Sequence, residues 1–205
     1  MPRHTREGAL SALAAAGLAL SAVLAAPAHA APKAPGFLSA ADLPPHPSSS
    51  WTAGRVTAGV PEATDRDTCL RALPGHQRAW HRDFRTDLDT GARQITVVLP
   101  DTRSAQHLVS ALNKDIRSCP VRVEAADPEL DVTMRDYGKL SVEEGAHVYG
   151  LHTETSWGAS DIRLLSAGRD GRTVTVVDWG QLGGFAGAPV KAFKKTTTTA
   201  VNKLN

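Results

Sequence analysis

Cysteine, aromatic residues and net charge are all scarce in this chain of 205 residues, which has two cysteines, 5% aromatic residues and a formal net charge of +2. The near balance of charge gives no argument for nucleic acid or a charged membrane surface as a partner. The local signatures of common active sites are also missing, since no G-x-S-x-G, S-x-x-K or H-E-x-x-H occurs. The sequence therefore offers no catalytic residue and implies no cofactor.

Histidine is the residue type left for a metal site. Two pairs, His76/His81 and His147/His152, are each separated by five residues. On a strand this spacing places the two rings on opposite faces, so neither pair is ready to chelate an ion. We expect no metal site.

The first thirty residues are typical of a cleaved secretory signal peptide. Arg3 and Arg6 give a positive start, Ala9–Ala26 is an almost unbroken apolar run, and Ala28 and Ala30 form an A-x-A cleavage site. A membrane anchor is the alternative, but the run ends in a cleavage site rather than in basic stop-transfer residues. No cysteine follows directly to accept a lipid, and no later segment approaches transmembrane length. We expect a secreted protein.

Cleavage after residue 30 would leave a chain whose length suits one domain. Residues 31–36 are rich in proline and alanine, and we expect a disordered leader there. Residues 37–205 would then form a single domain without internal repeats, and we expect it to be a monomer.

The two cysteines, Cys69 and Cys119, are interpreted through the predicted export. Outside the cytosol, two cysteines most simply form one disulfide. Neither lies in a C-x-x-C or a histidine-flanked pattern, which argues against a reactive thiol or a metal ligand. Closing a loop of this length would stabilise the fold by about 4 kcal/mol in the chain-entropy model.

Hydrophobic periodicity predicts an α+β fold, with a central, mostly antiparallel sheet of five to seven strands packed with two main α-helices. The firmest unit is a hairpin over Gln77–Leu99 followed by an amphipathic helix over Thr102–Ser118. A last helix follows Pro189, and Asp170-Gly171 predicts a hairpin turn. The other expected elements are a short helix at Asp65–Leu73, strands at Val121–Glu124, Asp131–Asp136, His147–Ser156, Asp161–Ala167 and Thr173–Trp179, and a loop at Lys139–Gly145.

Three features together resemble the extracellular sensor domain of PknH-type bacterial Ser/Thr kinases, a family that also has stand-alone secreted members in actinobacteria. They are the segment Phe37–Pro44, the cysteine pair Cys69 and Cys119, and the strand Gln94–Asp101 that runs into a helix. The resemblance covers most of residues 37–204. It implies a central antiparallel sheet with a ligand-binding cleft, and binding rather than chemistry. The kinase-linked domains carry a second disulfide, for which this chain has no cysteines.

The four tryptophans provide most of the large aromatic surface. Trp80 and Trp179 fit the faces of predicted strands and are expected in the core. Trp157 lies in a predicted turn, Ser156-Trp157-Gly158, where a large ring is hard to bury. We predict an exposed ligand-facing patch there, formed by Trp157, His152 and Asp178.

These observations favour a secreted, non-catalytic binding or sensor-type domain that recognises a small molecule or a cell-envelope component. Two alternatives remain open. One is a small secreted hydrolase with a dispersed site, which needs a serine or carboxylate within hydrogen-bond reach of a histidine. The other is an envelope-interacting scaffold that uses Lys191, Lys194, Lys195 and Lys203 on the last helix. The glycine-rich segment 180–187 could serve as a lid over a ligand.

Overall fold

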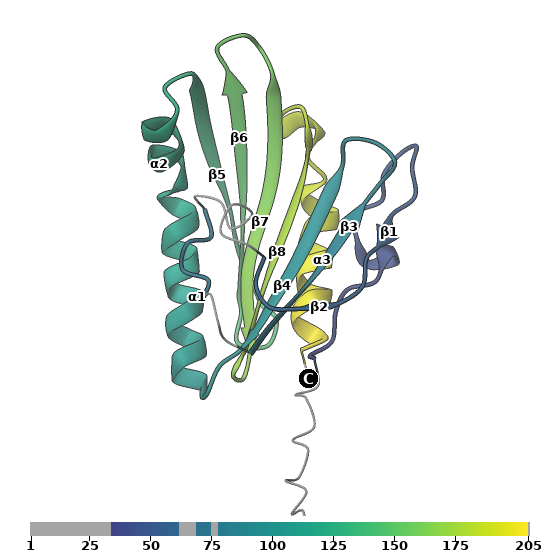
Figure 1. The fold of residues 1–205 in the computed structure, drawn as a ribbon, viewed down its shortest axis with the longest axis vertical. Helices are drawn as coiled ribbons and strands as arrows, with labels where there is room; N and C mark the ends of the chain where they lie inside the picture. The colour runs from purple at the N-terminus through teal and green to yellow at the C-terminus, as the bar shows by residue number, and fades with distance from the viewer. Residues whose placement is uncertain (1–33, 62–68, 75–77, 205) are drawn as a thin grey trace, which may run out of the picture. The chain divides into compact units, whose positions relative to one another are not determined.

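The computed structural model describes residues 34–61, 69–74 and 78–204, and these contain an eight-stranded antiparallel sheet with three α-helices (Figure 1). This confirms the predicted α+β class and its antiparallel sheet. The predicted signal peptide lies outside the described residues. Gly36, expected in a disordered leader, instead packs against the backbone of Lys203.

The sheet is almost a simple meander in which one late strand is inserted between earlier ones. The order is β1 (Thr52–Ala53), β3 (Arg78–Arg85), β4 (Gly91–Val98), β8 (Thr173–Leu182), β7 (Ser160–Asp170), β6 (Ala146–Thr155) and β5 (Leu130–Leu140), while β2 (Thr57–Ala58) also pairs with β3. Because β8 lies between β4 and β7, the end of the chain is brought beside the β3–β4 hairpin.

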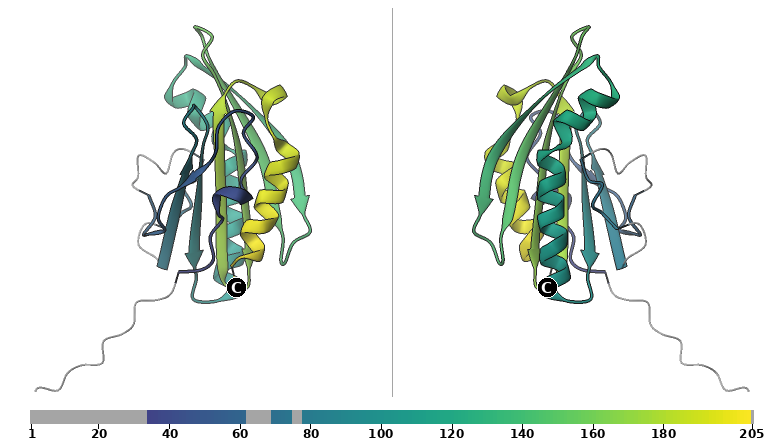
Figure 2. Two further views of the ribbon diagram at one scale, coloured as in Figure 1. Left: turned by 90° about the vertical axis from the view of Figure 1, so that its right-hand side faces the viewer. Right: turned by 90° about the vertical axis from the view of Figure 1, so that its left-hand side faces the viewer.

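Helices cover the two faces of the sheet. The helices are α1 (Thr102–Arg117), α2 (Cys119–Ala126) and α3 (Val190–Asn202), with single 3₁₀ turns η1 (Ala40–Asp42) and η2 (Phe185–Gly187). Figure 2 shows α3 in front of the sheet from one side and α1 in front of it from the other. The hydrophobic side chains of the strands therefore form two cores, one under each helix.

Local chemistry explains the elements that the sequence predicted well. Asp101 caps α1, because its Oδ1 accepts a hydrogen bond of 2.7 Å from the Ser104 N–H. Gly171 adopts a φ of +52° in the β7–β8 turn, a conformation that costs glycine little. The strands on either side of this turn pair from Asp170 and Thr173 onward, as the Asp-Gly signal predicts.

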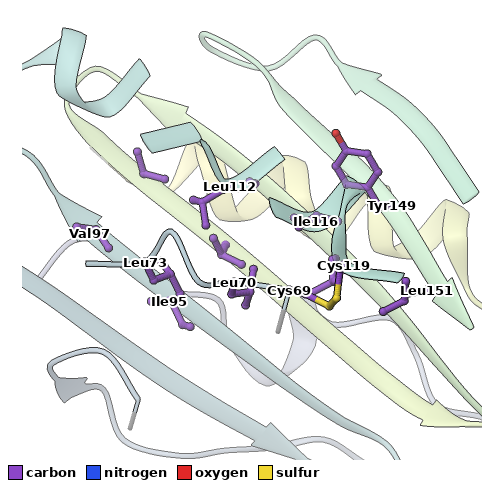
Figure 3. Close-up of a cluster of buried hydrophobic side chains, with 14 of the residues drawn as sticks. Cys69, Leu70, Leu73, Ile95, Val97, Leu112, Ile116, Cys119, Tyr149 and Leu151 are labelled. Atoms are coloured by element: carbon purple, nitrogen blue, oxygen red, sulfur yellow. A yellow bond between two sulfur atoms is a disulfide. The ribbon is translucent and has the colours of Figure 1, made fainter. Parts of the chain in front are cut away.

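The core under α1 contains the predicted disulfide. Cys69 and Cys119 are joined, are 1% and 0% exposed, and share this core with Leu112 and Ile116 of α1 (Figure 3). The bond connects the segment before the β3–β4 hairpin to the start of α2. A carboxylate oxygen of Asp115 supports the same junction by accepting 2.7 Å from the Ala72 N–H.

Three details of the predicted secondary structure were wrong. Val121–Glu124 belongs to helix α2 rather than to a strand, because Pro120 occupies the first turn of a helix, where its missing N–H costs nothing. Strand β5 runs on to Leu140, through a bulge between Asp136 and Gly138, so part of the expected loop 139–145 is strand. The helix expected over 65–73 lies partly outside the described residues, and Cys69–Leu73 forms turns.

The N-terminal segment is held along the α3 face of the sheet, next to the yellow helix in Figure 1. The buried Gln94 amide accepts 2.7 Å from the Leu38 N–H. Thr196 of α3 donates 2.6 Å to the Asp42 carbonyl, and Lys203 pairs with the Asp42 carboxylate at 2.5 Å. These bonds fix the start of the Pro44–Ser48 loop above the second core.

Candidate ligand-binding pocket

The three residues predicted to form a ligand patch do not come together. Trp157 is 67% exposed in the β6–β7 turn, as expected. The sheet register places His152 opposite Ile162 and Asp178 opposite Leu165. Since these two positions on β7 are an odd number of residues apart, the side chains of His152 and Asp178 lie on opposite faces.

Asp178 belongs to the α1 face of the sheet and is part of a charged row. Its Oδ2 lies 2.6 Å from Arg163 Nη2, and its cross-strand partner Arg93 pairs with Asp83. Ion pairs of this half-exposed kind contribute little to stability individually. Because Asp178 is already paired with Arg163, its carboxylate is not free to bind a ligand.

His152 lies on the α3 face and has a serine within hydrogen-bond reach, as a hydrolase with a dispersed site would need. Its Nε2 is 2.7 Å from Ser160 Oγ. However, the Ser160 hydroxyl also donates to the Gly183 carbonyl at 3.2 Å. When it does so, His152 must donate to Ser160, which is the reverse of nucleophile activation. Within the described residues, no carboxylate hydrogen-bonds to His152 to orient it as a base.

A different site emerges where the N-terminal segment, the β3–β4 turn and the segment after β8 meet. This cavity, of about 390 Å³, is lined by Trp51 and Trp179, and we call it the tryptophan pocket. One wall is the proline-rich loop 44–48, and the opposite walls are residues 88–90 and residues from 181 to 189. Its volume falls in the lower part of the range of about 300–1,000 Å³ typical of small-molecule sites.

Hydrogen bonds hold the walls of this pocket in place. The Trp51 indole N–H donates 2.7 Å to the Pro44 carbonyl, which ties the ring to the proline loop. The Asp87 N–H donates to Ser49 Oγ at 3.1 Å, linking that loop to the β3–β4 turn. Across the pocket, the Leu182 N–H donates 3.0 Å to the Asp89 carboxylate. The three wall segments are thus connected to one another.

Two residues that line the pocket, Thr90 and Trp179, carry buried polar atoms without hydrogen-bond partners. Thr90 and Trp179 are each 2% exposed, yet Thr90 Oγ1 and Trp179 Nε1 make no hydrogen bond. Both residues line the same pocket. An unpaired buried donor costs about 1–3 kcal/mol, so such groups need an explanation.

The rim of the same pocket carries exposed apolar side chains. Leu88 is 57% exposed and Leu182 is 60% exposed, and both line the cavity. Large apolar side chains that gather at a cavity mouth are typical of binding sites. Trp157 and Val121, the most exposed large apolar residues, do not line this cavity.

The electrostatic character of the tryptophan pocket is mild. His46 and Asp89 are its titratable lining residues, and among the residues that the structure describes no lysine or arginine reaches it. His46 Nδ1 accepts from the backbone N–H groups of Ser48 and Ser49, so the ring proton is on Nε2. The pocket therefore presents donors, acceptors and apolar surface without a fixed positive charge.

Another hollow, of about 290 Å³, lies between α1 and the start of β6 and is lined by His147. Burial of Asp136 alone would raise its pKa, but hydrogen bonds from His147 and from the Gly138 N–H outweigh burial and lower the pKa. The His147 ring stacks on Tyr149, whose pKa is raised by burial despite the nearby Arg117. Because His147 already bonds to Asp136 and stacks on Tyr149, this hollow is a weaker candidate for a ligand-binding site.

The basic face proposed for the last helix is smaller than the sequence suggested. Lys194 donates 2.7 Å to the Tyr137 carbonyl, and Lys203 pairs with Asp42. Lys191 and Lys195 are the two that remain exposed on α3. Two lysines on one helix give a solvated face more readily than an anion-binding surface.

Across residues 34–61, 69–74 and 78–204, no three His, Cys, Asp or Glu side chains are grouped to hold a metal ion. The same part of the chain has no helix that is long and apolar enough to cross a membrane. Comparisons of the chain with protein-family models, with curated proteins and with solved structures found no match.

The sequence patterns did not predict the tryptophan pocket as a site, although they pointed to parts of its surroundings. Trp179 is buried in the core as predicted, and residues 180–187 do border a cavity. Thr90 gave no signal at all, because a threonine beside a turn is ordinary. The one available hint was the combination of a proline-rich loop with Trp51, which suggests an ordered loop with an aromatic anchor.

Proposed function

We propose that this protein is an exported, non-catalytic binding domain that takes a small extracellular ligand in the tryptophan pocket. The observation that carries the proposal is that two residues lining one cavity, Thr90 and Trp179, each carry a buried polar atom without a hydrogen-bond partner. A ligand that supplies hydrogen-bond partners there recovers the free energy that these groups cost in the free protein. The resemblance to PknH-type sensor domains implies a binding cleft as well, and agrees with this proposal.

Ligand access is part of the proposal. Both unpaired atoms are buried in the free protein, so a ligand reaches them only when a pocket wall moves outward. The wall that moves in this proposal is the segment after β8, where Gly183, Gly184 and Gly187 are small hinge residues and the Leu182 N–H bond to Asp89 must break. Segments of this kind often act as lids.

Export is supported by two features. The sequence of residues 1–30 has the parts of a signal peptide, and the buried disulfide between Cys69 and Cys119 is a bond that persists in oxidising compartments. N-terminal sequencing of the protein recovered from the culture medium should begin at Ala31. Retention of the whole protein inside the cell would contradict export.

The binding proposal is tested by a thermal-shift screen of the protein produced from its full chain. The screen covers sugars, amino acids, short peptides and polar lipid head groups, followed by isothermal titration of any compound that raises Tm. Leu182→Ser changes the exposed pocket rim, and Val121→Ser is the matched control, since Val121 is 71% exposed but lies on α2 away from the pocket. We expect a ligand whose binding is weakened by the first variant and unaffected by the second. Absence of any saturable ligand, or equal binding by both variants, would contradict the proposal.

The second candidate function is ester hydrolysis with Ser160 as nucleophile, favoured only by its 2.7 Å contact with His152. A fluorophosphonate probe would label an activated serine, and Ser160→Ala would abolish that label. We expect no labelling, because the Ser160 hydroxyl is also bonded to the Gly183 carbonyl. Stoichiometric labelling that is lost in Ser160→Ala would establish the enzyme instead.

A further inference from the structure

We infer that the ligand of the tryptophan pocket is an uncharged carbohydrate. This inference rests on the proposed function, and it concerns only the chemical class of the ligand. The charge, the hydrogen-bonding groups and the apolar surfaces of the pocket all support this class of ligand.

The charge of the pocket argues against an anionic ligand. Binding of phosphates and carboxylates generally uses arginine or lysine, and in the described part of the chain neither residue type lines this cavity. The Asp89 carboxylate adds negative potential at the wall. A phosphorylated or acidic ligand would therefore be repelled rather than held.

The hydrogen-bonding groups match hydroxyl-bearing molecules. Thr90 Oγ1 and Trp179 Nε1 are unpaired, and His46 Nε2 carries the ring proton, so three groups can donate to ligand oxygens. The carboxylate of Asp89 and the amide of Gln181 can accept. A sugar hydroxyl donates and accepts at the same time, so it suits a pocket where both kinds of group lie close together.

The apolar surfaces of the pocket suit the C–H faces of a sugar ring. Trp51 is half-buried and lines the cavity, with prolines beside it and with Leu88 and Leu182 at the rim. Sugar rings are amphipathic, with C–H faces that pack on aromatic and apolar surfaces and hydroxyls that point to the edges. The lining of the tryptophan pocket offers both kinds of surface, with tryptophan, proline and leucine side chains beside polar ones.

Two other ligand classes fit less well. A quaternary ammonium group would favour tryptophan faces beside Asp89, but it has no acceptor for the Thr90 or Trp179 donor. Recognition of a proline-rich peptide uses an aromatic groove. Here the chain's own Pro44 already takes the Trp51 indole N–H, at 2.7 Å, so that donor is not available to a peptide carbonyl.

The test is a tryptophan-fluorescence titration of the full-chain protein with defined probes. Neutral probes are methyl pyranosides, cellobiose, maltose and chitobiose, and the others are glucose 6-phosphate, glucuronate, choline and a prolyl tripeptide. We expect at least one neutral sugar to bind saturably, and its acidic counterpart to bind about tenfold more weakly or not at all.

Variants locate the site. Thr90→Val keeps the shape of the side chain but removes its hydroxyl, and should weaken sugar binding by about fivefold to tenfold. Leu182→Ser should also weaken it, while Val121→Ser should bind like the wild type. Binding of choline, the peptide or an acidic sugar in place of neutral sugars, with loss in Leu182→Ser, would overturn this inference and leave the binding function intact. Failure of every probe here and in the wider screen would overturn both.

Discussion

Replacing Thr90 by valine should make the free protein more stable, which is unusual for a substitution in a buried site. Thr90 is 2% exposed, and its Oγ1 has no hydrogen-bond partner. Valine has nearly the same shape, so the packing of the β3–β4 turn is retained while the unpaired hydroxyl is removed. The backbone carbonyl of Thr90, which accepts from Thr86, is unaffected.

The size of the effect follows from the desolvation of one hydroxyl. A buried polar group without a partner costs about 1–3 kcal/mol, and valine adds the burial of a methyl group. We expect the free energy of unfolding to rise by about 1 kcal/mol. For a domain of this size, such a change raises Tm by about 2–4 °C.

The assay is urea denaturation followed by circular dichroism, with Thr86→Val as the matched control. Thr86 is also buried, at 5% exposure, and is close to Thr90. Its hydroxyl donates 3.0 Å to the Thr90 carbonyl and accepts 3.2 Å from the Leu88 N–H. Thr86→Val should therefore lower the free energy of unfolding by about 1 kcal/mol, opposite in sign to Thr90→Val.

A Thr90→Val protein that is no more stable than the wild type would refute the reasoning. It would mean that the Thr90 hydroxyl is already hydrogen-bonded in the free protein, for example to water. The tryptophan pocket would then have no unpaired threonine donor to attract a ligand. The same result would remove half of the observation on which the proposed function rests.

Three further predictions concern stability. Replacing Cys69 and Cys119 together by alanine should lower the free energy of unfolding by about 4 kcal/mol in denaturant titrations, because the disulfide closes a long loop; unchanged stability would contradict this. Gly168→Ala should cost about 1–3 kcal/mol, since a Cβ would lie 2.7 Å from side-chain carbons of β6 and α3; a neutral result would show that both can yield. At Asp42, burial alone would raise the pKa, but hydrogen bonds from Lys203 and Ser39 outweigh burial and lower the pKa below the ordinary 3.8. The ionised Asp42 therefore stabilises the fold above pH 3.8, and this stabilisation is lost as the pH falls through the lowered pKa. Asp42→Asn should flatten the acid limb of a stability–pH profile, and an identical limb would count against this account.

Much of the fold could be predicted because it is encoded locally. The stripe of apolar residues from Ala105 to Ile116 defines the buried side of α1, and the alternation in β4 and β8 defines strands. The Asp170-Gly171 turn sets the β7–β8 hairpin. Where local signals conflicted, prediction failed. In α2, Pro120 lies in the first turn of a helix, although the residues that follow it, Val121–Glu124, predict a strand.

The ligand patch predicted from the sequence failed for a different reason, because the faces of its residues depend on strand register and on which strands become neighbours. Whether His152 and Asp178 share a face depends on their pairing across β7, and an odd offset puts them on opposite sides. No local pattern specifies that offset. The sequence could show that both residues are on strands, but it could not show that they are separated by the sheet.

By itself, the sequence determined the α+β class, the single cysteine pair and the positions of the main hairpins and helix α1. Tertiary structure alone decided where the tryptophan pocket lies. Insertion of β8 beside β4 brings Trp179 next to the turn that holds Thr90, and the N-terminal loop then covers both with Trp51. A missing hydrogen-bond partner is a property of packing among these distant segments, so no single stretch of sequence carries it.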